Sequence, residues 1–276
     1  MHPVLKIPAQ LYDAYIFDLD GTVYLGDELV PGAAEAIKAL RRAGKRTVFL
    51  SNNPTHTRDD YAAKLTRLGL VTPVEDVINS SMVMVNFLRR ELPGGRLFVI
   101  GEEPLQDELC AAGFELTDDV RRIDAVITSF DRTFDYRKLQ IAFDAIRAGA
   151  RFFATNADRF CPVPGGGEPD CGAIIAAIEA CTDTCVEVVV GKPSVHTAEA
   201  ILNLLGLSPE RCLMIGDRHH ETYQELLDTT DWDSLGPGGD PRCANCLTHC
   251  GFEPAAVLSS NKGVRDVLKM AVWQMT

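Results

Sequence analysis

The chain is organised around one stretch near its N-terminus, Tyr15-Ile16-Phe17-Asp18-Leu19-Asp20-Gly21-Thr22-Val23-Tyr24. An apolar run that leads into two carboxylates and a Gly-Thr pair predicts a strand whose carboxyl end carries the chemistry. Alternate side chains of a strand share a face, so we expect Asp18 and Asp20 to project into one cleft. Open α/β sheets bind their ligands at that end of the strands. The alternative interpretation of the same residues is a solvated acidic turn.

Two carboxylates this close repel each other, so we expect a divalent cation between them or a raised pKa on one of them. Mg²⁺ is the natural candidate, because it prefers hard oxygen ligands and is usually held by one or two carboxylates together with substrate phosphate. Zinc is less favoured. Cys243-x-x-Cys246, followed by His249 and Cys250, resembles a metal cluster but lacks the second paired half of a zinc ribbon or finger.

Composition narrows the class of protein. The 276 residues are 46% hydrophobic and 24% charged, which is typical of a globular protein with a proper core. A net charge of -12 and a pI of about 4.9 argue against a nucleic-acid backbone or an anionic membrane as partner. Residues 1–6 lack the apolar core of a signal peptide, and nine scattered cysteines fit reduced thiols, so we expect a cytoplasmic protein.

The order of the predicted elements places polar residues after four strands. A strand at 47–50 ends at Ser51-Asn52-Asn53, and a helix at 57–68 follows with Thr57 as N-cap and Asp60 at the capping-box position. A strand at 186–190 ends at Gly191-Lys192, and one at 212–215 ends at Gly216-Asp217. We expect these to be successive strand ends of one α/β sheet.

Between them runs a second alternation of strands and helices, which predicts a second parallel sheet. Its strands are expected at 96–101, 125–128 and 151–155, and its helices at 104–112, 136–148 and 173–180. A helix at about 81–92 precedes this alternation, and 162–169 is expected to be a turn-rich loop.

These four strand ends resemble the haloacid dehalogenase-like hydrolase superfamily. Asp-Gly-Thr-Val-Tyr at 20–24, Leu-Ser-Asn-Asn at 50–53 and Val-Gly-Lys-Pro at 190–193 are similar to subclass IIA, which has the larger, C2-type cap and includes 4-nitrophenylphosphatases and sugar, nucleotide and pyridoxal phosphate phosphatases. The resemblance covers about residues 12–218. It implies a Rossmann-like α/β core with a parallel sheet at 1–80 and 186–276, and a smaller inserted α/β cap at 81–185.

The resemblance also implies roles for single residues. Asp18 is expected to be the nucleophile that forms an aspartyl-phosphate, and Asp20 the general acid and base. Ser51, the backbone N–H of Asn52 and Lys192 are expected to hold the phosphate. Mg²⁺ is expected to bind Asp18, the backbone carbonyl of Asp20, Asp217 and a phosphate oxygen, and to be taken up from solution.

The expected partner is a small phosphorylated metabolite, without nucleic acid or membrane, and cap-to-cap homodimers would suit this subclass. The cap would close over the site and supply specificity. Asp131 and Arg132, at the end of a cap strand, are the candidate substrate contacts, with an ordinary surface loop as the alternative. Pro169-Asp170-Cys171-Gly172 departs from the subclass pattern of Pro-Gly-x-Gly.

The resemblance fails after Asp217. Thr222 stands where a second acid is expected, with Glu221 as its candidate replacement, and no strand is recognisable where the sheet should gain one. One hypothesis is that part of 219–250 is a shifted reading frame. The sequence therefore predicts a Mg²⁺-dependent phosphatase, with a phosphomutase and a catalytically impaired phosphate-binding or regulatory protein as alternatives.

Overall fold

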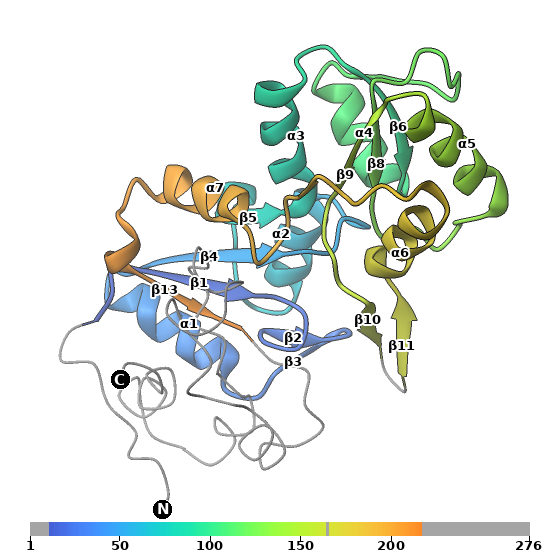
Figure 1. The fold of residues 1–276 in the computed structure, drawn as a ribbon. Coiled ribbons are helices and arrows are strands. Elements are labelled where there is room, and N and C mark those ends of the chain that lie inside the picture. The colour runs from blue at the N-terminus through green and yellow to red at the C-terminus, as the bar shows by residue number, and fades with distance from the viewer. Residues whose placement is uncertain (1–10, 164–165, 217–276) are drawn as a thin grey trace, which may run out of the picture. The chain divides into compact units, whose positions relative to one another are not determined.

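The computed structural model describes residues 11–163 and 166–216 (Figure 1). These residues form two compact units. The described part of the first comprises 11–50, 62–77 and 201–216, and that of the second comprises 51–61, 78–163 and 166–200. The domain boundaries expected from the sequence, with a core at 1–80 and 186–276 and a cap at 81–185, stay a prediction.

The sheet of the first unit contains the strand that was expected to carry the chemistry. Its strand order is β13-β1-β4-β5, with β1 at Ala14–Asp18, β4 at Arg46–Ser51, β5 at Val77–Asn79 and β13 at Cys212–Ile215. Strand β1 runs parallel to both neighbours, and Phe17 pairs with Phe49 on one side and Ile215 on the other. Parallel sheets are usually covered by other elements on both faces, and their strands are therefore hydrophobic on both sides. This explains why the apolar run of β1 is continuous.

Two helices near this sheet follow their sequence signals. Helix α1 (Ala33–Arg42) begins after Pro31-Gly32 and buries one face of alanine, isoleucine and leucine side chains. Helix α2 (Arg58–Arg67) has the predicted capping box: Asp60 N donates to Thr57 Oγ1 at 3.1 Å, and Thr57 N donates to Asp60 Oδ2 at 2.9 Å. A short antiparallel hairpin was not predicted; it joins β2 (Tyr24–Leu25) to β3 (Glu28–Leu29).

The second unit is built on a separate five-stranded sheet of order β12-β9-β8-β6-β7, in which every paired strand is parallel. Strand β6 is Arg96–Ile100, β7 is Glu115–Leu116, β8 is Ala125–Thr128, β9 is Arg151–Ala154 and β12 is Val188–Val189. Four of its helices are α3 (Ser80–Glu91), α4 (Glu103–Ala111), α5 (Tyr136–Arg147) and α6 (Cys171–Thr182). The predicted second α/β pattern is thus confirmed.

The core of this unit lies between the sheet and two helices, α5 and α6. Strand residues Phe98, Val126 and Phe152 belong to one buried hydrophobic cluster with Ala145 of α5 and Ile178 of α6. Burying such side chains contributes about 1.5–3 kcal/mol each for the larger ones. Figure 1 shows α5 and α6 beside these strands. The described residues also form α7 (Val195–Leu205) and 3₁₀ turns at Val74–Asp76 and Pro209–Arg211.

Two expectations about this part of the chain were wrong. The strand before Lys192 does not join the sheet of Asp18, because β12 pairs with β9 through Val188 with Phe153 and Val189 with Ala154. The expected loop at 162–169 is an antiparallel hairpin of β10 (Phe160–Val163) and β11 (Gly166–Pro169). Within 162–169, both Val163 and Gly166 belong to paired strands, so the turn-forming composition did not exclude strand structure.

Some of the predicted features fall outside the described residues. Asp217, Glu221 and Thr222, the Cys243-x-x-Cys246 motif and the segment 219–250 all lie there, so the shifted-frame hypothesis stays a hypothesis. Among the described helices, none has the length and apolar character needed to cross a membrane.

Candidate active site

Asp18 ends strand β1 between two parallel neighbours. Its partner in β4 is Leu50, and on the other side Gly216 follows Ile215, the partner of Phe17. The half-buried carboxylate accepts a hydrogen bond from Leu19 N at its Oδ1 atom, at 2.9 Å. The sheet therefore fixes the position of this carboxylate at its carboxyl edge, where parallel sheets bind ligands.

A tight turn follows Asp18. The carbonyl of Leu19 accepts from the backbone N–H groups of Val23 at 2.9 Å and Thr22 at 3.2 Å, and Gly21 N donates to Tyr24 O at 2.8 Å. Gly21 has a φ of 82°, a left-handed conformation that glycine adopts without strain. Because Leu19 and Val23 are fully buried, the turn is anchored on both sides of Asp20. The Asp-x-Asp-Gly-Thr sequence thus forms a tight, hydrogen-bonded loop that carries two carboxylates.

The residues around Asp18 are suitable for a small divalent cation. A Cβ atom at position 216 would lie 3.6 Å from Asp18 Cβ and 3.8 Å from Asp18 Oδ2, so residue 216 lies directly beside this carboxylate. The side chain of Thr22 has a buried hydroxyl without a hydrogen-bond partner among the described residues. Carboxylate, carbonyl and hydroxyl oxygens are hard donors of the kind that Mg²⁺ prefers. Asp217, the other expected ligand, lies outside the described residues.

Ser51 ends β4, one residue beyond the partner of Asp18, and is buried. Its hydroxyl accepts from Asn53 N at 3.1 Å and donates to Tyr61 Oη at 3.3 Å, while Tyr61 Oη donates to Asn53 O at 2.8 Å. Ser51 was predicted from the sequence, but Tyr61 was not, because a tyrosine on the helix after the loop has no distinguishing signal in the sequence. The serine is thus held by Asn53 of the loop that it begins and by Tyr61 of helix α2, which follows that loop.

Lys192 lies beside the same loop. Its backbone N–H donates to Asn52 Oδ1 at 2.7 Å, and Asn52 Nδ2 donates to Lys192 O at 3.0 Å. The second unit thus brings together Ser51, Asn52 and Lys192, three residues predicted to hold phosphate, although they are about 140 positions apart in the sequence. Asp18 and Asp20 belong to the first unit.

Asp131, a predicted specificity residue, is buried in the loop that follows β8. Its carboxylate accepts from Lys138 Nζ at 2.6 Å, and from Thr133 N at 2.9 Å and Thr133 Oγ1 at 2.7 Å. The side chain of Asp131 has no exposed surface. These bonds give it a structural role in the loop after β8, and its role as a substrate contact stays a prediction.

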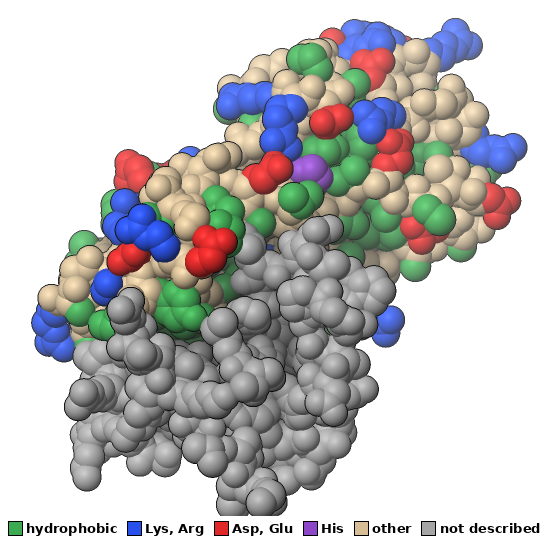
Figure 2. Space-filling view, turned by 60° about the vertical axis from the view of Figure 1, so that its left-hand side comes forward, with side chains coloured by type: hydrophobic (Ala, Val, Ile, Leu, Met, Phe, Trp, Pro, Cys, Tyr) green, Lys and Arg blue, Asp and Glu red, His purple; other side chains and the backbone are tan. Residues whose placement is uncertain are grey.

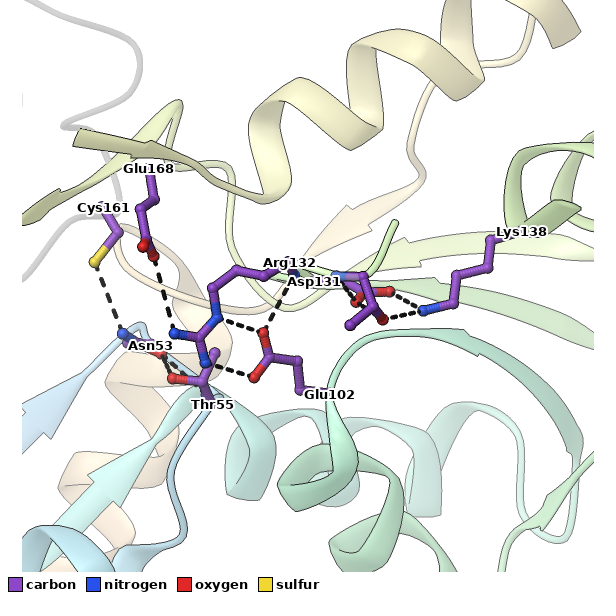
Figure 3. Close-up of polar contacts among 9 residues, drawn as sticks. Asn53, Thr55, Glu102, Asp131, Arg132, Lys138, Cys161 and Glu168 are labelled. Atoms are coloured by element: carbon purple, nitrogen blue, oxygen red, sulfur yellow. Dashed lines mark hydrogen bonds and ion pairs between the residues drawn. The ribbon is translucent and has the colours of Figure 1, made fainter. Parts of the chain in front are cut away.

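Arg132, the second predicted specificity residue, forms a bidentate ion pair with Glu102 (Figure 3). Arg132 Nε donates to Glu102 Oε1 and Nη2 to Oε2, both at 2.7 Å, and Glu168 Oε2 lies 4.0 Å from Nη1. The hydrogen bond from Arg132 is the main reason that the pKa of Glu102 is lowered, and the same bond raises the pKa of Arg132. The guanidinium is half-exposed, so it keeps a face open to solvent while Glu102 fixes its orientation.

Charged side chains of both signs lie on the face of the described residues that Figure 2 draws. Figure 2 shows acidic and basic side chains interspersed on the face it draws, without a basic patch among the residues described there.

Comparison with known proteins gives consistent matches. The family model for haloacid dehalogenase-like hydrolases matches residues 15–115, and one for a domain of unknown function matches residues 197–270. Sugar-phosphatase AraL of Bacillus subtilis is 43% identical over 202 residues, which are 73% of this chain and 74% of that protein.

Solved structures match as well. The structure of 4-nitrophenylphosphatase from Thermotoga maritima has a TM-score of 0.72 at 34% identity and covers 75% of this chain and 78% of its own. A glycerol phosphate phosphatase from Mycobacterium tuberculosis, solved in complex with calcium, has a TM-score of 0.68 at 32% identity and covers 75% of this chain and 60% of its own.

Proposed function

Because the chain belongs to the haloacid dehalogenase-like hydrolases and is a phosphomonoester hydrolase, we propose that it hydrolyses a small phosphate ester through an aspartyl-phosphate on Asp18. The observation that supports this most is the position of Asp18 at the carboxyl end of β1, beside Gly216 and before the tight turn that carries Asp20. Among sugar phosphates, nucleotides and pyridoxal phosphate, we favour a sugar phosphate, because the relative from Bacillus subtilis is a sugar phosphatase.

The two carboxylates have different roles in this proposal. Asp18 attacks phosphorus and forms an acyl phosphate, which divides one difficult displacement into two easier ones. Asp20 protonates the leaving alkoxide oxygen in the first step and takes a proton from the attacking water in the second. The turn anchored by Leu19 and Val23 supports this assignment, since acid–base catalysis needs a carboxylate held in a fixed place.

The phosphate contacts in this proposal come from Ser51, the backbone N–H of Asn52 and Lys192. Donors fixed before the reaction stabilise the charge that develops on phosphate oxygens, and Lys192 adds a positive charge. A bound Mg²⁺, held by Asp18, the carbonyl of Asp20 and Asp217, would reduce the repulsion between the nucleophile and the anionic ester. The relative solved with calcium supports a divalent-cation site in this family.

The test is a phosphatase screen of the purified full chain over sugar phosphates, nucleotides, pyridoxal phosphate and 4-nitrophenyl phosphate, with and without Mg²⁺. We expect phosphate release that requires the cation, and its loss in Asp18→Asn. Retained activity in Asp18→Asn would contradict the proposal. If the wild-type chain binds phosphate analogues but releases no phosphate, the alternative of an impaired phosphate-binding or regulatory protein is correct. An isomerised product would instead indicate a phosphomutase.

A further inference from the structure

The side chain of Asn52 is bonded to both polar groups of one backbone residue. Asn52 Oδ1 accepts from Lys192 N at 2.7 Å, and Asn52 Nδ2 donates to Lys192 O at 3.0 Å. A backbone N–H can only donate, so the amide oxygen must face Lys192 N and the amide nitrogen must face Lys192 O. The primary amide therefore holds the main chain of Lys192 much as a neighbouring strand would.

Asn52 is itself held from two other elements. Its second amide hydrogen is directed at Asp158, whose Oδ2 accepts at 2.9 Å. The backbone carbonyl oxygen of Asn52 accepts hydrogen bonds from Ser80 Oγ at 2.6 Å and from Asn156 Nδ2 at 3.2 Å. Ser80 and Asn156 are buried, and Asn156 Oδ1 also accepts from Asp158 N at 3.1 Å. The start of α3 and the segment after β9 thus fix both the backbone and the amide of Asn52.

Close packing makes the arrangement intolerant of displacement. A Cβ atom at Gly191 would lie 2.3 Å from Thr155 O and 2.8 Å from Asn52 Oδ1, both far inside contact distance. Glycine is therefore required where the chain passes Asn52 on its way to Lys192. The hydrogen bond from Val190 N to Ala154 O, at 3.0 Å, fixes the chain one residue earlier.

We propose that Asn52 and, to a smaller degree, Asp158 are positioning residues for Lys192. Asn52 would contribute its backbone N–H to the phosphate and its side chain to the lysine, so that two phosphate contacts move as one body. Asp158 has the smaller share because it is exposed and acts only by orienting the amide. This inference rests on the proposed function, which assigns Lys192 to the phosphate, but the hydrogen bonds that carry it are independent of substrate.

The sharpest variant is Asn52→Asp, which keeps the shape of the side chain and removes both N–H donors of its amide. A carboxylate at position 52 would face Lys192 O and Asp158 Oδ2, neither of which can donate a hydrogen bond. We expect kcat for 4-nitrophenyl phosphate to fall about 100-fold, a loss typical of a misplaced catalytic group, with KM changed less. The deficit should shrink at acidic pH, where the protonated carboxyl group of the variant can donate again. Asn203→Asp, the same change at an exposed site on α7, is the control and should leave kcat unchanged.

Two further comparisons separate positioning from a general structural role. In a Lys192→Ala background, Asn52→Asp should change kcat by less than about twofold, since its effect passes through the lysine. The double variant Asn52→Asp with Asp158→Asn should recover part of the lost activity, because the amide introduced at position 158 can donate to the new carboxylate. Fully additive losses in the first comparison, or an unchanged pH profile of the Asn52→Asp deficit, would overturn the proposal.

Hydrogen exchange tests the arrangement without any activity. The Lys192 N–H should exchange slowly in the wild-type chain and at least about tenfold faster in Asn52→Ala, because its acceptor is removed. Equal exchange in the two proteins would overturn the inference even if the enzyme is an active phosphatase. Conversely, if the wild-type chain releases no phosphate while this difference in exchange is observed, the proposed function fails and the hydrogen-bonded arrangement stands.

Discussion

Replacing Asp170 with asparagine should make the protein more stable at neutral pH. Asp170 is the N-cap of α6, and its carboxylate accepts from Cys171 N at 2.5 Å and from the side chain of Asn156. Burial raises the pKa of this carboxyl from 3.8 to about 6, and the nearby charge of Asp158 adds to the effect. Ionisation of the buried Asp170 therefore destabilises the folded state. Asparagine at this position would keep an acceptor for Cys171 N and would carry no charge.

The sign and size of the effect follow from linkage. Between pH 3.8 and about 6 the folded chain keeps a proton that the unfolded chain has lost, so this group's contribution to stability falls as the pH rises through that interval. A pKa difference of about two pH units corresponds to a free energy of unfolding of about 3 kcal/mol. The gain of Asp170→Asn over wild type should thus be near zero at about pH 3.5 and approach about 3 kcal/mol above about pH 7.

The assay is urea unfolding followed by far-ultraviolet circular dichroism, for both proteins over this pH range. Subtracting one curve from the other removes the contributions of other titrating groups. Asp135→Asn is the matched control, because Asp135 is the N-cap of α5 and also accepts from a backbone N–H, that of Lys138 at 2.8 Å, but is exposed. A gain for Asp170→Asn that is constant over the pH range, or that decreases toward neutral pH, would refute the reasoning.

Two further substitutions test close contacts of the second unit. Gly191→Ala should lower the free energy of unfolding by about 1–3 kcal/mol and reduce phosphatase turnover, because the new methyl group overlaps Thr155 O. Its control in urea unfolding is Gly166→Ala, since a Cβ atom at position 166 meets nothing within 4 Å. Equal losses of stability in the two variants would contradict the close packing around Gly191. Glu102→Gln should change the KM for sugar phosphates more than kcat, because it removes a charge that orients Arg132; unchanged kinetics across the substrate panel would exclude this role.

Local sequence signals predicted much of the fold. The strands at 125–128 and 212–215 were predicted with their observed bounds, and Thr57 with Asp60 forms the expected capping box. These elements are determined by neighbouring residues, through apolar runs and through side chains that satisfy the first N–H groups of a helix. Asp18 was predicted at a strand end for the same reason, and β1 ends there.

Contacts between distant residues could not be predicted in the same way. The two valines of β12 fit either sheet equally well, and only their pairing with β9 distinguishes the two. The bonds from Asn52 to Lys192 span 140 positions and those from Arg132 to Glu102 span 30, and neither pair has a local signal. Asn156 and Asp158 were assigned no role in the site from sequence, although they hold the loop of predicted phosphate contacts.

Asp18 as the covalent nucleophile can be tested with the Asp20→Asn variant and 4-nitrophenyl phosphate in the presence of Mg²⁺. Nitrophenolate leaves without protonation, so phosphoryl transfer to Asp18 should still occur, while hydrolysis of the acyl phosphate should slow because its general base is missing. We predict a burst of about one nitrophenolate per enzyme, and borohydride reduction of the quenched protein should convert residue 18 to homoserine, detected by mass spectrometry. A covalent phosphate on another residue, or the same burst from Asp18→Asn, would contradict the mechanism.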